Sequence, residues 1–213
     1  MTVKLKDVVK FIQAHLGRLA DSLKRAKNLV SIYKNAIKAN PSDESKYSDL
    51  LRAAVVFTHA ALEDFLRSLA SVYLPYADEK VLDKIPLAGS EGHTEKFCLG
   101  KLAPHRKKTI DELIKLSVND NLKRTTYNNT TDITCLLQQI GLDVEKVRPT
   151  FPQLEKLIKR RHQIVHNCDK INASSGDKTE KLKVRTVEVW IKTVGTFGTK
   201  IVAQCISTKL GKK

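Results

Sequence analysis

Three side chains close together in one short segment are suited to acid–base and charge-stabilising chemistry. Residues 152–167 read PQLEKLIKRRHQIVHN. Their apolar residues have the spacing of one helix face: Leu154, Leu157, Ile158, Ile164 and Val165. Arg161 falls in the middle of this stripe, where a guanidinium must find an acceptor or reach a wet cleft, because burying it unpaired is costly. His162 and His166 are one turn apart along one edge of the stripe.

One arginine and two histidines suit the cleavage of RNA by transesterification. In that reaction the ribose 2′-hydroxyl is the nucleophile, so the protein supplies only proton transfer and charge stabilisation. A histidine with a pKa near neutrality takes or gives a proton, and an arginine neutralises the charge that builds on the phosphorane. The residues therefore predict a site that needs no metal and no cofactor, with Arg161, His162 and His166 as its catalytic candidates.

A second helix supplies candidate supporting residues. His59 and Glu63, again one turn apart, lie at the edge of a stripe centred on Thr58, Leu62 and Phe65. If this helix packs beside 152–167, the Glu63 carboxylate is a candidate partner for the Arg161 guanidinium, holding it without using all five donors. We expect His59 and Glu63 to be structural rather than catalytic.

Two segments carry a resemblance to a known family. RHQIVHN, residues 161–167, resembles the R-x4-6-H signature of HEPN-domain proteins, and in particular of the RiboL-PSP-like branch, whose form is close to R-[NH]-x-[IV]-V-H. HAALEDFL, residues 59–66, is similar to that branch's helix of small residues, Leu-Glu and an aromatic. Arg161 and His166 match the two ends of the signature. His162 stands where many members have Asn, Asn167 ends the segment as a supporting residue, and Glu63 matches the helix-two acid.

The resemblance implies a helical bundle that forms a homodimer with a composite cleft. It also implies metal-independent endoribonuclease activity, often in toxin–antitoxin or antiphage defence roles with an antitoxin or regulatory protein as partner. The alternative is a HEPN-like module that only binds nucleic acid or a protein, with the motif serving the dimer interface. Activity on RNA separates these two hypotheses.

The charge of the chain also favours RNA as a partner. The 213 residues contain 38 lysines and arginines against 23 aspartates and glutamates, a formal charge of +15. Such a field concentrates polyanions and supplies sequence-independent affinity for phosphate. Lys156, Lys159 and Arg160, beside the motif, are the candidate RNA-binding residues. The alternative is a basic surface that serves only solubility.

The elements that must position these residues are helices. Apolar residues at alternating steps of three and four predict one long helix from Val8 to about Ile37. Residues 40–43 (NPSD) break and recap the chain, and a second long helix with apolar residues from Leu51 to Val72 ends near Pro75, so that the two form an antiparallel hairpin. Residues 76–131 read as a loop-rich excursion containing a short helix at 108–117, and residues 119–131 as a loop. Helices at 132–140, with Gly141 as C-cap, at 152–167 and at about 179–208 follow. The prediction is one all-α domain over 1–213, an up-and-down bundle of four or five helices with long irregular connections.

Other classes of protein are disfavoured. Cys98, Cys135, Cys168 and Cys205 are more than thirty residues apart, without the spacing of a zinc site or a disulfide framework, so we expect free thiols. The longest apolar stretch, residues 53–57, is too short to span a membrane, and the N-terminus lacks the apolar core of a secretory signal. We therefore expect a cytoplasmic protein with no membrane contact.

Overall fold

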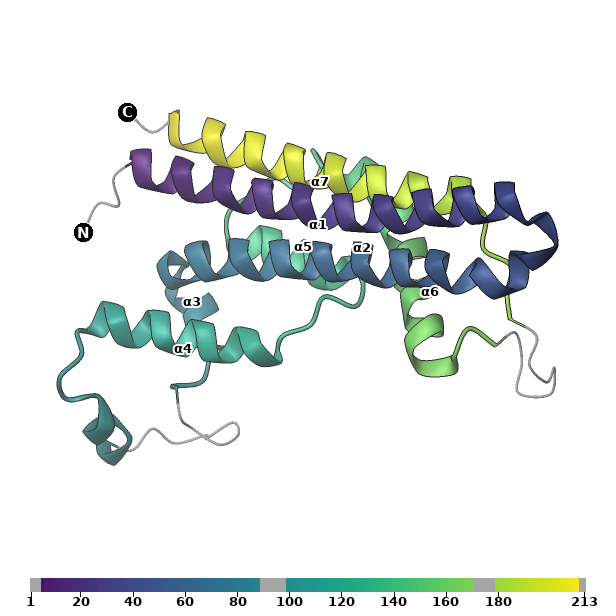
Figure 1. Ribbon diagram of the computed structural model, residues 1–213. Helices are drawn as coiled ribbons and strands as arrows, with labels where there is room; N and C mark the ends of the chain where they lie inside the picture. The colour runs from purple at the N-terminus through teal and green to yellow at the C-terminus, as the bar shows by residue number, and fades with distance from the viewer. Residues whose placement is uncertain (1–4, 89–98, 171–178, 211–213) are drawn as a thin grey trace.

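The computed structural model describes residues 5–88, 99–170 and 179–210, and all of its long elements are helices (Figure 1). Within these ranges the α-helices are α1 (Leu5–Ala39), α2 (Glu44–Tyr73), α3 (Glu79–Leu82), α4 (Ile110–Arg124), α5 (Thr130–Gln139), α6 (Phe151–Asn167) and α7 (Val184–Leu210). No strand longer than an isolated bridge occurs in these three ranges. The all-α class predicted from the sequence is confirmed.

The long helices α1, α2 and α7 lie side by side and form the body of the bundle (Figure 1). Asn40 and the 3-10 turn Pro41–Asp43 reverse the chain between α1 and α2, as the helix-breaking residues predicted. The core between these helices is built from regularly spaced apolar residues, among them Leu23, Val30, Leu62, Phe197 and Ile201, all at most 5% exposed. The side chains of Val8 and Ile12, expected in the α1 stripe, lie outside the described residues.

A glycine on α7 sets how closely α1 approaches it. A Cβ added at Gly198 would lie 2.3 Å from the Leu19 side chain, a distance no side chain tolerates without a shift. The absence of a side chain therefore lets Leu19 pack directly onto the backbone of α7. Because burial of Leu19 depends on this approach, the Gly is part of the packing between the two helices.

Helices α4 and α6 cover other faces of α2, and α5 lies against α6. Helix α6 packs against both α2 and α7, α4 packs against α2, and α5 packs against α6. Gly141 follows α5 with a φ of +72°, the left-handed conformation expected of a C-terminal glycine. Because α6 carries residues 161–167, its contacts with α2 and α7 set the position of the motif residues.

Two predicted boundaries were wrong. Helix α4 continues to Arg124, so the polar run from Asn119 is helical as far as that residue. Helix α4 begins with a capping box between Thr109 and Glu112. Val118 and Leu122, one turn apart, are both buried, which stabilises the helical conformation of the polar run between and after them. Helix α7 begins at Val184 rather than near Thr179, because the backbone of residues 179 and 180 pairs with the chain that follows α6.

Candidate functional site

Helix α6 presents its two histidines to solvent from a well-anchored base. Leu154 and Leu157 are fully buried and Ile158 is 5% exposed, which fixes the helix against its neighbours. Both His162 and His166 are exposed, as expected for the edge of the stripe. Their ring centroids are 4.4 Å apart and the rings are tilted by 40°. The two imidazoles therefore form one contiguous, solvent-accessible acid–base surface.

Arg161 is half-buried at the border between this surface and the core. Its charge contributes to lowering the pKa of His59, so the guanidinium lies within electrostatic reach of α2. No carboxylate among the described residues lies within 4.0 Å of it. The donors of this arginine are therefore not occupied by an ion pair within that part of the chain, which leaves them available to an anionic ligand.

The expected ion pair between Glu63 and Arg161 is not present. Glu63 Oε1 accepts hydrogen bonds from the backbone N–H of Tyr127, at 3.3 Å, and from Arg67 Nη2, at 3.4 Å. Arg67 also donates from Nε to the carbonyl of Thr125, at 3.1 Å. Glu63 and Arg67 thus attach the connection between α4 and α5 to α2. The Glu63 carboxylate is satisfied by this connection and by Arg67, and not by Arg161 as expected.

His59 is a buried, neutral histidine between α2 and the site. It is 1% exposed, and its Nδ1 is 3.8 Å from Glu63 Oε2. Burial lowers the pKa of His59 to about 4; the Glu63 carboxylate opposes this shift and the Arg161 guanidinium adds to it. At neutral pH the imidazole is therefore uncharged, which supports the structural role expected for it.

This burial predicts a pH dependence of stability. The unfolded chain protonates His59 near pH 6.5, whereas the folded protein protonates it only near pH 4. Between these values the unfolded state binds more protons than the folded state. The contribution of His59 to the free energy of unfolding is therefore complete above pH 6.5 and falls as the pH falls towards 4. Urea unfolding should show a loss of about 2 kcal/mol from this residue between pH 7 and pH 5.

The control for this prediction is a matched pair of variants. His59→Gln should remove most of the difference in unfolding free energy between pH 7 and pH 5. His162→Gln, which changes an exposed histidine, should leave the difference as in the wild type. A His59→Gln protein with the wild-type pH slope would show that His59 is not the group that titrates.

Arg160 lies in the core, which corrects its assignment to an exposed RNA-binding face. It is 6% exposed, and its Nη2 donates to Asp169 Oδ2 at 2.8 Å and to the carbonyl of Glu180 at 2.7 Å. Lys156 and Lys159 are exposed, as expected. Arg160 is buried because the chain after α6 folds back over it, a contact that helical periodicity within 152–167 does not reveal.

Two residues at the site were missed by the sequence analysis. Arg52 on α2 and Asp169 just after α6 are buried and joined by a hydrogen bond of 2.7 Å from Nε to Oδ2. A buried Asp is uncommon unless paired, but a single sequence gives no signal that these two positions meet.

Asn167, expected to support the motif, is the exposed last residue of α6, and its carbonyl accepts a hydrogen bond from the N–H of Lys170.

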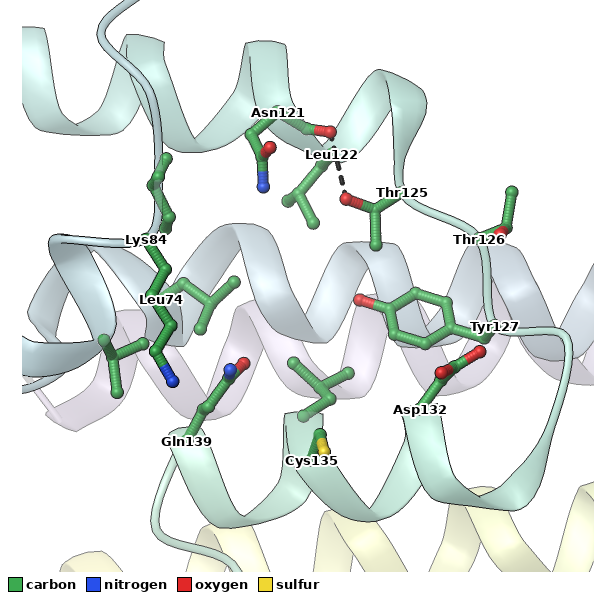
Figure 2. A pocket seen from close by; sticks show the side chains of 13 residues that line it. Leu74, Lys84, Asn121, Leu122, Thr125, Thr126, Tyr127, Asp132, Cys135 and Gln139 are labelled. Carbon is green, nitrogen blue, oxygen red and sulfur yellow. Dashed lines mark hydrogen bonds between the residues drawn. The ribbon is translucent and has the colours of Figure 1, made fainter. Parts of the chain in front are cut away.

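A cavity of about 270 Å³ lies between α4, α5 and the segment that runs from Leu74 to Ile85 (Figure 2). Tyr127 points its ring into this space, and the side chains of Asn121, Asp132 and Gln139 line it. Burial raises the pKa of the Tyr127 phenol to about 12, so it stays protonated. None of the motif residues lines this cavity, so the imidazole surface on α6 and the cavity are separate features.

The described residues give two further findings on ligands and membranes. Within residues 5–88, 99–170 and 179–210, no three His, Cys, Asp or Glu side chains are grouped to hold a metal ion. In the same part of the chain no helix has a window apolar and long enough to cross a bilayer. Cys135, Cys168 and Cys205 are free thiols, as expected, and Cys98 lies outside the described residues.

The chain is similar to a known protein family. Residues 20–206 match the family described as RiboL-PSP-HEPN. The matched range contains α2, α6 and the motif between residues 161 and 167. No curated protein and no solved structure matches the chain significantly.

Proposed function

Because the chain belongs to the RiboL-PSP-HEPN family, whose domains are commonly nucleases of the ribonuclease type, we propose that it is a metal-independent endoribonuclease. The observation that carries this proposal is the exposed pair of imidazoles, 4.4 Å apart, on the helix turn that also presents Arg161. This surface combines two proton-transfer groups with a cation that no described carboxylate neutralises. Those are the groups that cleavage by a 2′-hydroxyl needs.

The chemistry divides between the residues as follows. An imidazole accepts the proton of the ribose 2′-hydroxyl while the oxygen attacks the adjacent phosphorus. The bond from phosphorus to the 5′-oxygen breaks, and a protonated imidazole returns a proton to that leaving oxygen. His166 is the primary proton-transfer residue because it occupies the histidine position of the motif, and His162 is the second imidazole within reach. The products are a 2′,3′-cyclic phosphate and a 5′-hydroxyl.

Arg161 stabilises the charge on the pentacovalent phosphorane. Its half-buried position restricts the guanidinium and reduces its exposure to water, so its field at a bound phosphate is stronger than that of a freely exposed arginine. Lys156 and Lys159, exposed on the same helix, add contacts to neighbouring phosphates. RNA is thus held by positive charge and cut at the imidazoles.

The active form in this proposal is a homodimer with a composite cleft. HEPN domains often act as dimers, and Val165, between the two histidines in sequence, is 47% exposed. A second copy of α6 across a two-fold axis would cover this valine and bring a second set of motif residues to the cleft.

Sedimentation at micromolar concentration should show a dimer. Val165→Glu should weaken this dimer, whereas Val189→Glu, which changes an exposed valine on α7, should not. A monomer with full activity would contradict the composite cleft.

The biological setting proposed for this activity is a toxin–antitoxin or antiphage defence system in the cytoplasm. The exposed imidazole surface is accessible to an antitoxin or regulatory protein that would block it. Expression of the wild-type chain should then arrest growth, whereas His166→Ala should not. Equal growth with both proteins would remove the support for a toxin role.

The reaction is tested by incubating the purified protein with structured RNAs in EDTA and analysing the new ends. Cleavage should persist in the chelator and leave a cyclic or 3′-phosphate together with a 5′-hydroxyl. Complete loss of cleavage in EDTA, restored by a divalent cation, would overturn the metal-independent mechanism. RNA binding without cleavage under any condition would favour the module that only binds nucleic acid.

A further inference from the structure

A cluster of three buried ionisable side chains joins α2 to the end of α6. Asp169 is fully buried, Arg160 is 6% exposed and Arg52 is 9% exposed. One carboxylate oxygen, Asp169 Oδ2, accepts from Arg52 Nε at 2.7 Å and from Arg160 Nη2 at 2.8 Å. Both guanidinium groups also donate to the carbonyl of Glu180, and Arg160 is paired with the Glu180 carboxylate. We call Arg52, Asp169 and Arg160 the buried ionic cluster.

The backbone at this cluster is held in an unusual conformation. Cys168 and Asp169 have φ values of +50° and +59°, and they are the non-glycine residues with positive φ in the described chain. Residues with a side chain rarely adopt this region, and they persist there only when the surroundings determine the conformation. The N–H of Asp169 bonds to the carbonyl of Gln163, and the N–H of Glu180 bonds to the carbonyl of Asp169. The cluster therefore fixes the chain that leaves α6.

Stability alone does not account for this arrangement. Taking ionised groups out of water is costly, and a buried ion pair often contributes little net stability compared with an apolar replacement. What two arginines on one carboxylate do supply is a defined geometry, because the planar guanidinium forks constrain the direction of each hydrogen bond. The position of Asp169, three residues after His166, is thus set from two helices at once.

The cluster also sets how α6 lies along α2. Arg52 contacts Asp169, two residues after the end of α6, whereas His59, two turns later on α2, is within electrostatic reach of Arg161, earlier on α6. The two helices therefore run in opposite directions at this contact. Fixing Arg52 to Asp169 fixes the position of the motif relative to His59.

We propose that the buried ionic cluster of Arg52, Asp169 and Arg160 is a positioning device for the turn of α6 that carries His166 and Asn167. The cluster acts through the backbone of residues 167–169 and touches no substrate. Its importance for cleavage rests on the function proposed above, but its effect on the histidines is a property of the unliganded protein. Loss of one of its hydrogen bonds therefore displaces the imidazole of His166 relative to Arg161.

The test compares Asp169→Asn and Arg160→Lys with the control Asp64→Asn. Asp64 belongs to an exposed Arg18–Asp64 pair with two contacts of 2.9 Å, so the control removes an equivalent charge from α2 without touching the cluster. Both cluster variants should lower kcat for RNA about tenfold or more with KM unchanged, as expected when geometry rather than binding is lost. Asp64→Asn should change neither.

A spectroscopic measurement decides the proposal independently of activity. In ¹³C- and ¹⁵N-labelled protein, the imidazole signals of His166 should shift in both cluster variants and stay in place in Asp64→Asn. If the wild-type protein proves inactive on RNA, the proposed function fails, but these signals still test the positioning role. Folded Arg160→Lys protein with wild-type His166 signals, even with a lower melting temperature, would show that the cluster is only structural and would overturn the proposal. If Asp169→Asn fails to fold, Arg160→Lys alone decides.

Discussion

His166→Ala is expected to abolish RNA cleavage while leaving the fold unchanged. His166 is exposed in the last turn of α6, so its removal sacrifices little buried surface and leaves the packing of Leu154 and Leu157 intact. Removal of a general acid or base commonly costs about 10²–10⁴-fold in rate, and we expect at least about 10³-fold here. Single-turnover cleavage and circular dichroism of the same preparation measure both properties.

The control for this substitution is His105→Ala. His105 ends a 3-10 segment outside α6, and its ring nitrogen is 3.3 Å from Lys108 Nζ. This variant should cleave at the wild-type rate. His162→Asn should lower the rate by less than His166→Ala does, because His162 is the second imidazole of the pair and His166 is the primary proton-transfer residue of the proposal. Cleavage by His166→Ala at the rate of His105→Ala, with contamination excluded, would show that the site is elsewhere.

Arg161→Lys is expected to lower kcat by about 100-fold or more while RNA affinity changes only a few fold. Lysine keeps the positive charge but loses the planar fork that can contact two phosphate oxygens. A group that acts mainly on the charge of the transition state affects kcat rather than binding. Rates at saturating RNA, together with binding to a non-cleavable RNA, separate the two effects.

The control for Arg161 is the exposed Arg148, whose ion pair with Glu145 lies outside the site. Arg148→Lys should leave both kcat and RNA affinity unchanged. Arg161→Ala should cost little stability, since Glu63 is held by Arg67 and Tyr127 rather than by Arg161. An equal loss of binding and kcat in Arg161→Lys would mean that the residue only binds RNA.

Local patterns in the sequence predict most of the fold. Apolar spacing of three and four residues predicts α1, α2 and α6 because each helix buries one continuous stripe, and prolines mark the ends of α1 and α2 and the start of α6. The exposed edge of α6 follows from the same geometry, which is why His162 and His166 are found where the stripe predicts them. The run 119–124 was misassigned because its polar residues conceal the buried pair Val118 and Leu122.

The partners of the arginines could not be predicted in the same way. Helical periodicity treats 152–167 as an isolated helix, and on that basis Arg161 is the core-facing arginine. In the folded chain Arg160 is the buried one, because Asp169 and Glu180 supply its acceptors. Likewise Glu63 is satisfied by the backbone of Tyr127, 64 residues away. These contacts depend on long-range folding of irregular segments, for which a single sequence carries no periodic signal.

In the proposed function, the imidazole surface of α6 cleaves RNA through the substrate's own 2′-hydroxyl. The most direct measurement compares single-turnover cleavage, in EDTA, of an RNA oligonucleotide and of the same oligonucleotide with one 2′-deoxy nucleotide at the mapped cleavage position. The wild-type protein should cut the RNA to a 2′,3′-cyclic phosphate and leave the deoxy position intact, and His166→Ala should cut neither. Cleavage at the deoxy position at a rate comparable to that of the RNA would contradict the account.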